Sequence, residues 1–70
     1  MTHAHRQITL NGKPREVSAL TLAAALGELG FADVKVATAV NGAFVPAAKR
    51  GETRLRDGDR VEVVSARVGG

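Results

Sequence analysis

The chain opens with a short alternation of polar and apolar side chains. Residues 7–10 (Gln-Ile-Thr-Leu) alternate with a period of two, which is typical of a strand buried on one face. Asn11-Gly12 follows and suits a tight hairpin, because both residues tolerate the positive φ angles of such a turn. A second strand is expected over residues 13–18, with Val17 as its inward anchor. Pro14 cannot donate a ladder hydrogen bond, so we expect it at the start of that strand or on a sheet edge.

The hydrophobic period changes near residue 21 to that of a helix. The predicted apolar face consists of Leu22, Ala25, Leu26 and Leu29. Thr21 is a suitable N-cap and Gly30 is placed to end the helix, which predicts a length of about nine residues. Gly27 weakens a helix by about 1 kcal/mol relative to alanine, so either the helix is weak there or a neighbouring backbone comes close. Phe31 and Val34 are expected to fill the connection beyond it.

Alternation returns at residues 36–40 and predicts a third strand, followed by the second turn, Asn41-Gly42. A two-residue turn fixes the register of the hairpin. The expected cross-strand pairs are Ala39 with Phe44 and Val40 with Ala43. The strand after the turn should stop at Pro46.

The last third of the chain begins with an irregular basic stretch, residues 47–54, for which we expect no regular element. Leu55 is its predicted core anchor. Asp57-Gly58-Asp59 predicts a turn in which Gly58 takes a left-handed conformation. The final strand is expected over residues 60–65, with Val61 and Val63 on one face and Val64 on the other.

The order strand, strand, helix, strand, strand, strand indicates an α+β arrangement in which one face of the sheet is covered and the other stays partly open. We expect a single domain over residues 1–70, in which residues 1–5 form a short disordered lead and 66–70 an extended tail. No apolar run approaches the length of a membrane span, so the expected location is cytoplasmic.

Composition narrows the possible chemistry. Twelve of the 70 residues are alanine, so the large apolar side chains suffice for one thin sheet and one helix but leave no room for a deep catalytic pocket. The chain has no cysteine, which excludes disulfides, thiolate catalysis and cysteine-ligated metals. His3 and His5 stand near a terminus without further ligands, so we expect no metal site.

Charge and aromatic content argue against a nucleic-acid partner. The ten Lys/Arg and seven Asp/Glu give a net charge of +3, but the charges are scattered along the chain rather than gathered in a stripe. Two Phe, with no Trp or Tyr, offer almost no stacking platform for unpaired bases.

Three segments together carry a resemblance to a known family. They are residues 40–46 (Val-Asn-Gly-Ala-Phe-Val-Pro), residues 55–63 (Leu-Arg-Asp-Gly-Asp-Arg-Val-Glu-Val) and the final pair Gly69-Gly70. Taken alone, a final Gly-Gly is as compatible with a frayed end or a linker remnant as with a functional tail. With all three segments the chain resembles the ubiquitin-like β-grasp proteins and, more narrowly, the ThiS family of sulfur carriers in thiamine biosynthesis, within the ThiS/MoaD superfamily.

This resemblance implies a mixed sheet of four to five strands, with the first and last strands side by side in its middle and one helix on one face. It also implies that Gly70 is adenylated by a partner and converted to a thiocarboxylate, which donates sulfur for thiazole formation. Gly69, Val68 and Arg67 would then enter the partner's channel, although Arg67 and Val68 are equally compatible with a solvated tail. Val64 is a candidate for a docking face or an ordinary exposed valine.

The implied partners are a ThiF-like adenylating enzyme, a ThiG-like thiazole synthase and a sulfur donor such as a cysteine desulfurase. ATP and Mg²⁺ would be used by the adenylating enzyme, because this chain has no phosphate-binding loop. The chain itself would be a protein co-substrate, not an enzyme, with no bound cofactor. Three alternatives stay open: a small subunit of molybdopterin synthase, a TGS-like regulatory module that binds RNA, and a protein-conjugating modifier.

Overall fold

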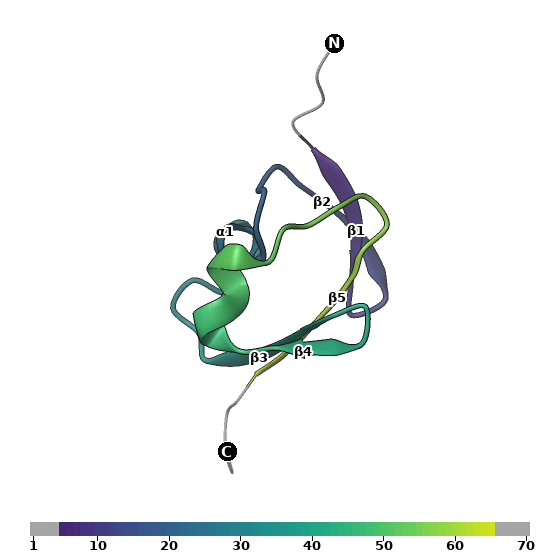
Figure 1. The fold of residues 1–70 in the computed structure, drawn as a ribbon. Helices are drawn as coiled ribbons and strands as arrows, with labels where there is room; N and C mark the ends of the chain where they lie inside the picture. The colour runs from purple at the N-terminus through teal and green to yellow at the C-terminus, as the bar shows by residue number, and fades with distance from the viewer. Residues whose placement is uncertain (1–4, 66–70) are drawn as a thin grey trace.

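The computed structural model describes residues 5–65 (Figure 1). Its elements, in chain order, are β1 (Arg6–Leu10), β2 (Lys13–Val17), α1 (Leu22–Glu28), β3 (Val36–Val40), β4 (Ala43–Val45), the 3₁₀ helix η1 (Ala47–Glu52) and β5 (Arg60–Ser65). The strands form one five-stranded sheet in the order β2-β1-β5-β3-β4. β1 and β5 are parallel and the other pairs are antiparallel. The predicted α+β fold is confirmed, including the central position of the first and last strands.

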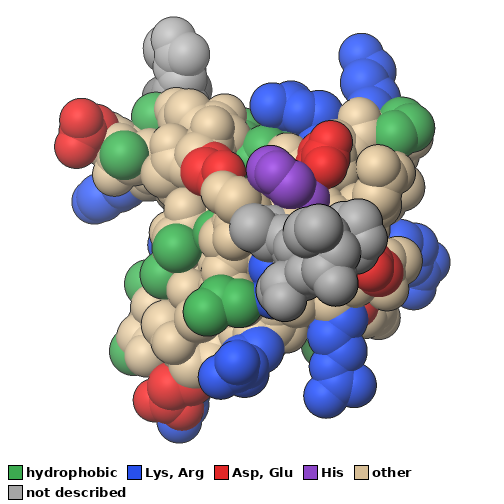
Figure 2. Space-filling view, turned by 90° about the horizontal axis from the view of Figure 1, so that it is seen from above, with side chains coloured by type: hydrophobic (Ala, Val, Ile, Leu, Met, Phe, Trp, Pro, Cys, Tyr) green, Lys and Arg blue, Asp and Glu red, His purple; other side chains and the backbone are tan. Residues whose placement is uncertain are grey.

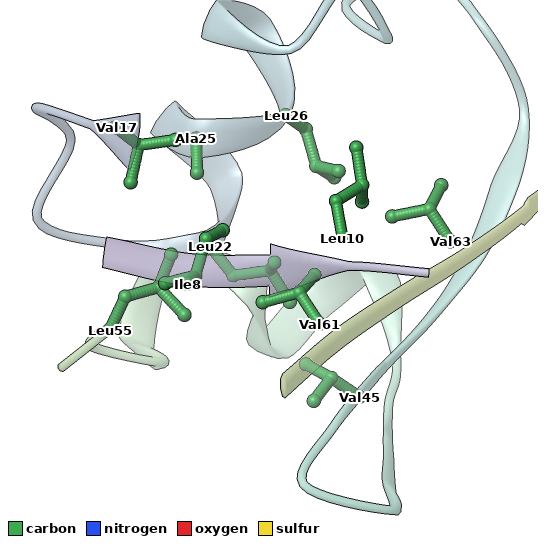
Figure 3. Packing of buried hydrophobic residues seen from close by; sticks show 10 residues of the cluster. All are labelled: Ile8, Leu10, Val17, Leu22, Ala25, Leu26, Val45, Leu55, Val61 and Val63. Atoms are coloured by element: carbon green, nitrogen blue, oxygen red, sulfur yellow. The ribbon is translucent and has the colours of Figure 1, made fainter. Parts of the chain in front are cut away.

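The core lies between the sheet and the helices, which Figure 1 shows together on one side of the strands. Its buried apolar residues are Ile8, Leu10, Val17, Leu22, Ala25, Leu26, Val45, Leu55, Val61 and Val63. Figure 3 shows the side chains of α1 pointing toward those of β1 and β5. Leu22 is fully buried and Val17 and Val61 are 1% exposed, so each predicted inward anchor is in place.

Both Asn-Gly pairs form the predicted hairpin turns. Asn11 and Asn41 each have φ of 51°, and the glycines that follow have φ of 87° and 86°. These values are typical of the type I′ turn, whose twist matches that of the flanking strands. The pairs Ala39–Phe44 and Val40–Ala43 are present as expected. Pro14 lies on the edge strand β2, where the sheet loses no ladder hydrogen bond through the missing N–H.

Helix α1 is held at both ends by the residues that predicted it. The Thr21 hydroxyl accepts a hydrogen bond from the Ala24 N–H. At the other end Gly30 has φ of 94°, and the Phe31 N–H donates to the Leu26 carbonyl while the Gly30 N–H donates to the Gly27 carbonyl. These two bonds make the Schellman motif, and the helix has seven residues, two fewer than the expected nine.

Two expectations about the connecting segments were wrong. Residues 47–52 are not irregular but form η1, because the Lys49 N–H donates to the Pro46 carbonyl and Arg50 is held by β3 through long-range bonds that no local pattern signals. Val34 does not fill the connection after α1, since it is 46% exposed. Of the two possibilities for Gly27, the close approach of a backbone is absent, because a Cβ added there would meet nothing within 4 Å. The second strand also ends at Val17 rather than residue 18.

Candidate functional site

Strand β5 is the element that the rest of the sheet holds in place. It pairs with β1 on one side and with β3 on the other, from Val40–Val61 to Val36–Ser65. Val61 and Val63 point into the core. In the sequence, β5 is followed directly by residues 66–70. Residues 66–70 therefore follow the middle strand of the sheet.

The side chain of Asn11 extends the pairing between β1 and β5. Its Oδ1 accepts from the Val63 N–H at 2.9 Å, and its Nδ2 donates to the Val63 carbonyl at 3.0 Å. A parallel ladder that ends at Leu10–Val61 is thus continued by an amide side chain that imitates a peptide group. The turn residue therefore fixes the second half of β5, 52 positions further along the chain.

Asn41 performs the same task at the start of β5. Its Oδ1 accepts from the Arg60 N–H at 2.9 Å and its Nδ2 donates to the Asp59 carboxylate at 3.0 Å. Asp59 also accepts from the Arg56 N–H at 2.8 Å, which closes the predicted turn with Gly58 at φ of 89°. The sequence predicted both asparagines as turn residues only. Their second role depends on the neighbouring strand, which the hairpin motif does not specify.

Asp57 ties the same turn to β1. Its Oδ1 accepts from the Gln7 N–H at 2.8 Å, and the Gly58 N–H donates to the Gln7 carbonyl at 2.7 Å. The two acidic side chains of the Asp-Gly-Asp turn therefore serve to position β5.

The face of the sheet away from the helices carries an apolar patch. We call it the sheet patch: Ala37, Ala39, Phe44 and Val64, with Glu62 among them. Phe44 is 68% exposed and Val64 63% exposed. Together with Asn11 and Thr38 they line a hollow of about 460 Å³ that is open to solvent. Phe44 on β4 and Val64 on β5 lie on either side of β3, and large exposed apolar side chains gathered on one face are typical of a protein interaction surface.

The predicted docking residue Val64 thus lies where it was expected, on the uncovered face. Phe44, a larger side chain that lines the same hollow, was not selected by the sequence analysis. Phe44 could have been found from the predicted register, because it faces Ala39 on the side opposite the core. The remaining predicted site residues (Arg67, Val68, Gly69 and Gly70) lie outside the described residues, as does His3.

Glu28 is an acidic group with a structural task. Its carboxylate accepts from the Ser18 hydroxyl at 2.7 Å and from the backbone N–H groups of Ser18 and Ala19, each at 2.9 Å. These bonds, that from the Ser18 side chain first, hold the pKa of Glu28 below its ordinary value of 4.5. The carboxylate joins the end of α1 to the segment that leaves β2.

Positive side chains do not gather into a track on the face seen in Figure 2. On the face seen in Figure 2, Lys and Arg side chains stand at separate points around the outline with acidic side chains between them. This face therefore offers no continuous basic path for a phosphate backbone. His5 lies 3.6 Å from the Glu16 carboxylate. Within residues 5–65 there is no group of three potential metal ligands, and no helix there is long and apolar enough to cross a membrane.

Comparison with known proteins gives a consistent set of matches. The model of the ThiS family matches residues 8–70. The crystal structure of a thiamine biosynthesis protein (ThiS) from Geobacter metallireducens superimposes with a TM-score of 0.77 and 31% identity, over 91% of this chain and 99% of that one. A thiazole synthase from Paramagnetospirillum magneticum (strain ATCC 700264 / AMB-1) is 38% identical over 65 residues, which are 91% of this chain. The chain spans only 20% of the length of that relative.

Proposed function

The chain belongs to the ThiS family, and we propose that it is a sulfur carrier of thiamine biosynthesis, a protein co-substrate on which partner enzymes act. A small subunit of molybdopterin synthase and an RNA-binding TGS-like module are less well supported as alternatives, because both the family model and the solved structure are those of ThiS proteins.

The proposed reactive group is the carboxyl group of Gly70. An α-carboxyl group has a pKa of about 3.5, so it is ionised at neutral pH and resists attack by a nucleophile. A ThiF-like adenylating enzyme, using ATP and Mg²⁺, would join AMP to it and release pyrophosphate. Sulfide then attacks the carbonyl carbon and AMP leaves, so that a carbon–sulfur bond replaces a carbon–oxygen bond. When a cysteine desulfurase supplies a persulfide instead, a second thiol must break the sulfur–sulfur bond to free the thiocarboxylate.

The absence of side chains at the end of the chain suits this chemistry. A side chain at Gly70 would crowd the carbonyl under attack, and one at Gly69 would widen the segment that enters a partner's channel. Residues 66–70, if extended, span at most about 17–18 Å, which is enough to reach an active site while the folded domain stays outside it. Within that segment we assign Arg67 and Val68 to contacts with the channel wall.

The observation that best supports the proposal is the position of β5. A carrier needs a rigid body from which its reactive end projects in a fixed direction, so that docking of the body aligns the end with an active site. β5 is held by two neighbouring strands and by the side chains of Asn11 and Asn41, and the sequence continues from Ser65 into the proposed reactive segment. We assign the sheet patch, with Phe44 and Val64, to docking of the partners.

Intact-mass measurement tests the proposal. The protein is incubated with a cognate adenylating enzyme, MgATP and sulfide. We expect the mass increase of one oxygen-for-sulfur exchange, located at Gly70 by fragmentation. A variant with one alanine appended after Gly70 is the matched control and should stay unmodified at Gly70. Failure of the wild-type chain to gain sulfur with several cognate partners would overturn the proposal.

A second step identifies the pathway. The sulfur-loaded protein is offered separately to a thiazole synthase and to a molybdopterin synthase, and loss of the thiocarboxylate is followed by mass. We expect turnover with the thiazole synthase, the second proposed partner. Turnover with the molybdopterin enzyme alone would keep the carrier chemistry but reject the thiamine assignment.

A further inference from the structure

A second hollow, of about 340 Å³, lies on the helix side of the sheet, between the end of α1 and η1. We call it the helix groove. The residues that matter for its chemistry are Ala23, Gly27, Phe31, Val34, Ala47 and Arg50. Except for Arg50 they are apolar or lack a side chain. The groove lies on the opposite layer from the sheet patch, so one partner can contact it without covering the other surface.

Gly27 leaves a gap in the wall of this groove. It lies inside α1, where glycine is less favourable than alanine. Nothing in the described part of the chain requires it, because φ is not positive there and an added Cβ would meet no atom within 4 Å. A missing side chain on an exposed helix surface allows the backbone of another protein to approach closely.

Arg50 places an uncompensated positive charge beside this gap. Arg50 is half-buried, and its guanidinium donates to the Val36 carbonyl at 2.6 Å and to the Thr38 hydroxyl at 3.1 Å, both neutral acceptors. Within residues 5–65 it has no ion pair, and its Nη1 makes no hydrogen bond there. A carboxylate brought by a partner would form a charge-assisted hydrogen bond with this group.

The other wall of the groove is apolar and exposed. Val34 is 46% exposed, and Phe31 is only partly covered by the core against which it packs. An aliphatic side chain that entered the groove would bury Val34. The groove is therefore complementary to a segment that carries an aliphatic side chain with a carboxylate close to it.

We propose that the helix groove binds such an aliphatic–acidic segment of the thiazole synthase that accepts the carrier's sulfur; this rests on the function proposed above. The relative from Paramagnetospirillum magneticum supports the choice of partner. There, the region similar to this chain makes up 20% of a protein named thiazole synthase, so carrier-like and remaining sequence are joined in one polypeptide. Domains in one polypeptide stay at a high effective concentration, which favours a further contact between them besides the one formed during sulfur transfer.

Gly27→Ala distinguishes an interface glycine from a merely structural one, because it should make the free protein more stable but its binding to the partner weaker. Without a clash in the free protein, alanine should raise the Tm by about 4–8 °C. In the complex, the methyl group occupies the gap and should raise the Kd for the cognate thiazole synthase by about tenfold. Gly51→Ala is the matched control, since Gly51 has equally open space above it but lies outside the groove. It should leave the Kd unchanged.

Arg50→Gln tests the charge, with Arg54→Gln as the control that removes the same charge from an exposed site outside the groove. We expect a Kd about five- to tenfold higher for Arg50→Gln and a weaker dependence of Kd on salt, with little change for Arg54→Gln. If Arg50→Gln does not fold, Gly27→Ala remains decisive.

An unchanged Kd for Gly27→Ala would overturn the proposal. It would also be overturned if the variant lost affinity only for the adenylating enzyme, or changed only self-association in sedimentation, because the occupant would then be that enzyme or a second copy. Sulfur loading of Gly27→Ala by mass keeps the two proposals apart. Normal loading with unchanged Kd rejects the groove alone, whereas no loading of the wild-type chain rejects the carrier function.

Discussion

Asn11 offers a direct test of how β5 is held. Replacing it with glycine keeps the backbone conformation, since glycine adopts φ of 51° without strain, and removes only the amide that pairs with Val63. Two hydrogen bonds are lost, each contributing about 0.5–1.5 kcal/mol. Because Asn11 is exposed to solvent on one side, we take the lower half of that range and expect a loss of about 1–2 kcal/mol in the free energy of unfolding.

Replacing Asn11 with alanine removes the same amide and adds backbone strain. Alanine at this left-handed φ is less favourable than glycine by about 1 kcal/mol. Asn11→Ala should therefore lose about 2–3 kcal/mol. The difference between the two variants isolates the backbone, and the difference between Asn11→Gly and wild type isolates the hydrogen bonds. A total loss of this size is a large part of the stability of a small domain.

Urea unfolding followed by far-UV circular dichroism measures both variants. With a slope of about 1 kcal/mol per molar urea for a domain of this size, the midpoint should fall by about 1–2 M for Asn11→Gly and further for Asn11→Ala. Amide hydrogen exchange at Val63 should accelerate in both, because its N–H loses the Asn11 acceptor. A stability for Asn11→Gly within about 0.5 kcal/mol of wild type would refute the argument that this side chain secures β5.

Three further predictions concern other parts of the molecule. The pKa of Glu28 is lowered, first by the Ser18 hydroxyl, so the stabilisation from its carboxylate is present above the ordinary pKa of 4.5 and is lost as pH falls through the pKa of the folded protein. In Glu28→Gln the free energy of unfolding should therefore fall less steeply with acid than in the wild type. An NMR titration that gives a Glu28 pKa of 4.5 or higher would contradict this prediction. Thr38→Val keeps the shape of a side chain that is 1% exposed but removes its bonds to Arg50 and to a β4 carbonyl, so unfolding measurements should show a loss of about 1–3 kcal/mol. Phe44→Ser and Val64→Ser should change stability by less than about 0.5 kcal/mol because both side chains are exposed, yet weaken binding to the adenylating enzyme in calorimetry; unchanged binding in both would remove the sheet patch from the proposal.

Local sequence determined the strands, the two hairpin turns and α1, but not η1. Period-two alternation identified the strands, the Asn-Gly pairs identified both hairpins and the register of the second, and Thr21 and Gly30 bounded α1. Each of these features depends on residues within a few positions of one another, so a short segment of the sequence is enough to identify it. The inward direction of Val17, Leu55 and Val61 followed from the same patterns. The neighbours of β5 in the sheet required the family resemblance as well.

Only the tertiary structure decided which elements lie side by side and which side chains bond across them. The amides of Asn11 and Asn41 reach β5 across 52 and 19 positions, and a turn motif contains no information about the strand that comes to lie beside it. η1 forms because Arg50 finds its acceptors on β3. For the same reason the sequence could not indicate that Val34 stays exposed. A side chain is buried only if another element arrives to cover it, and that depends on how the whole chain packs.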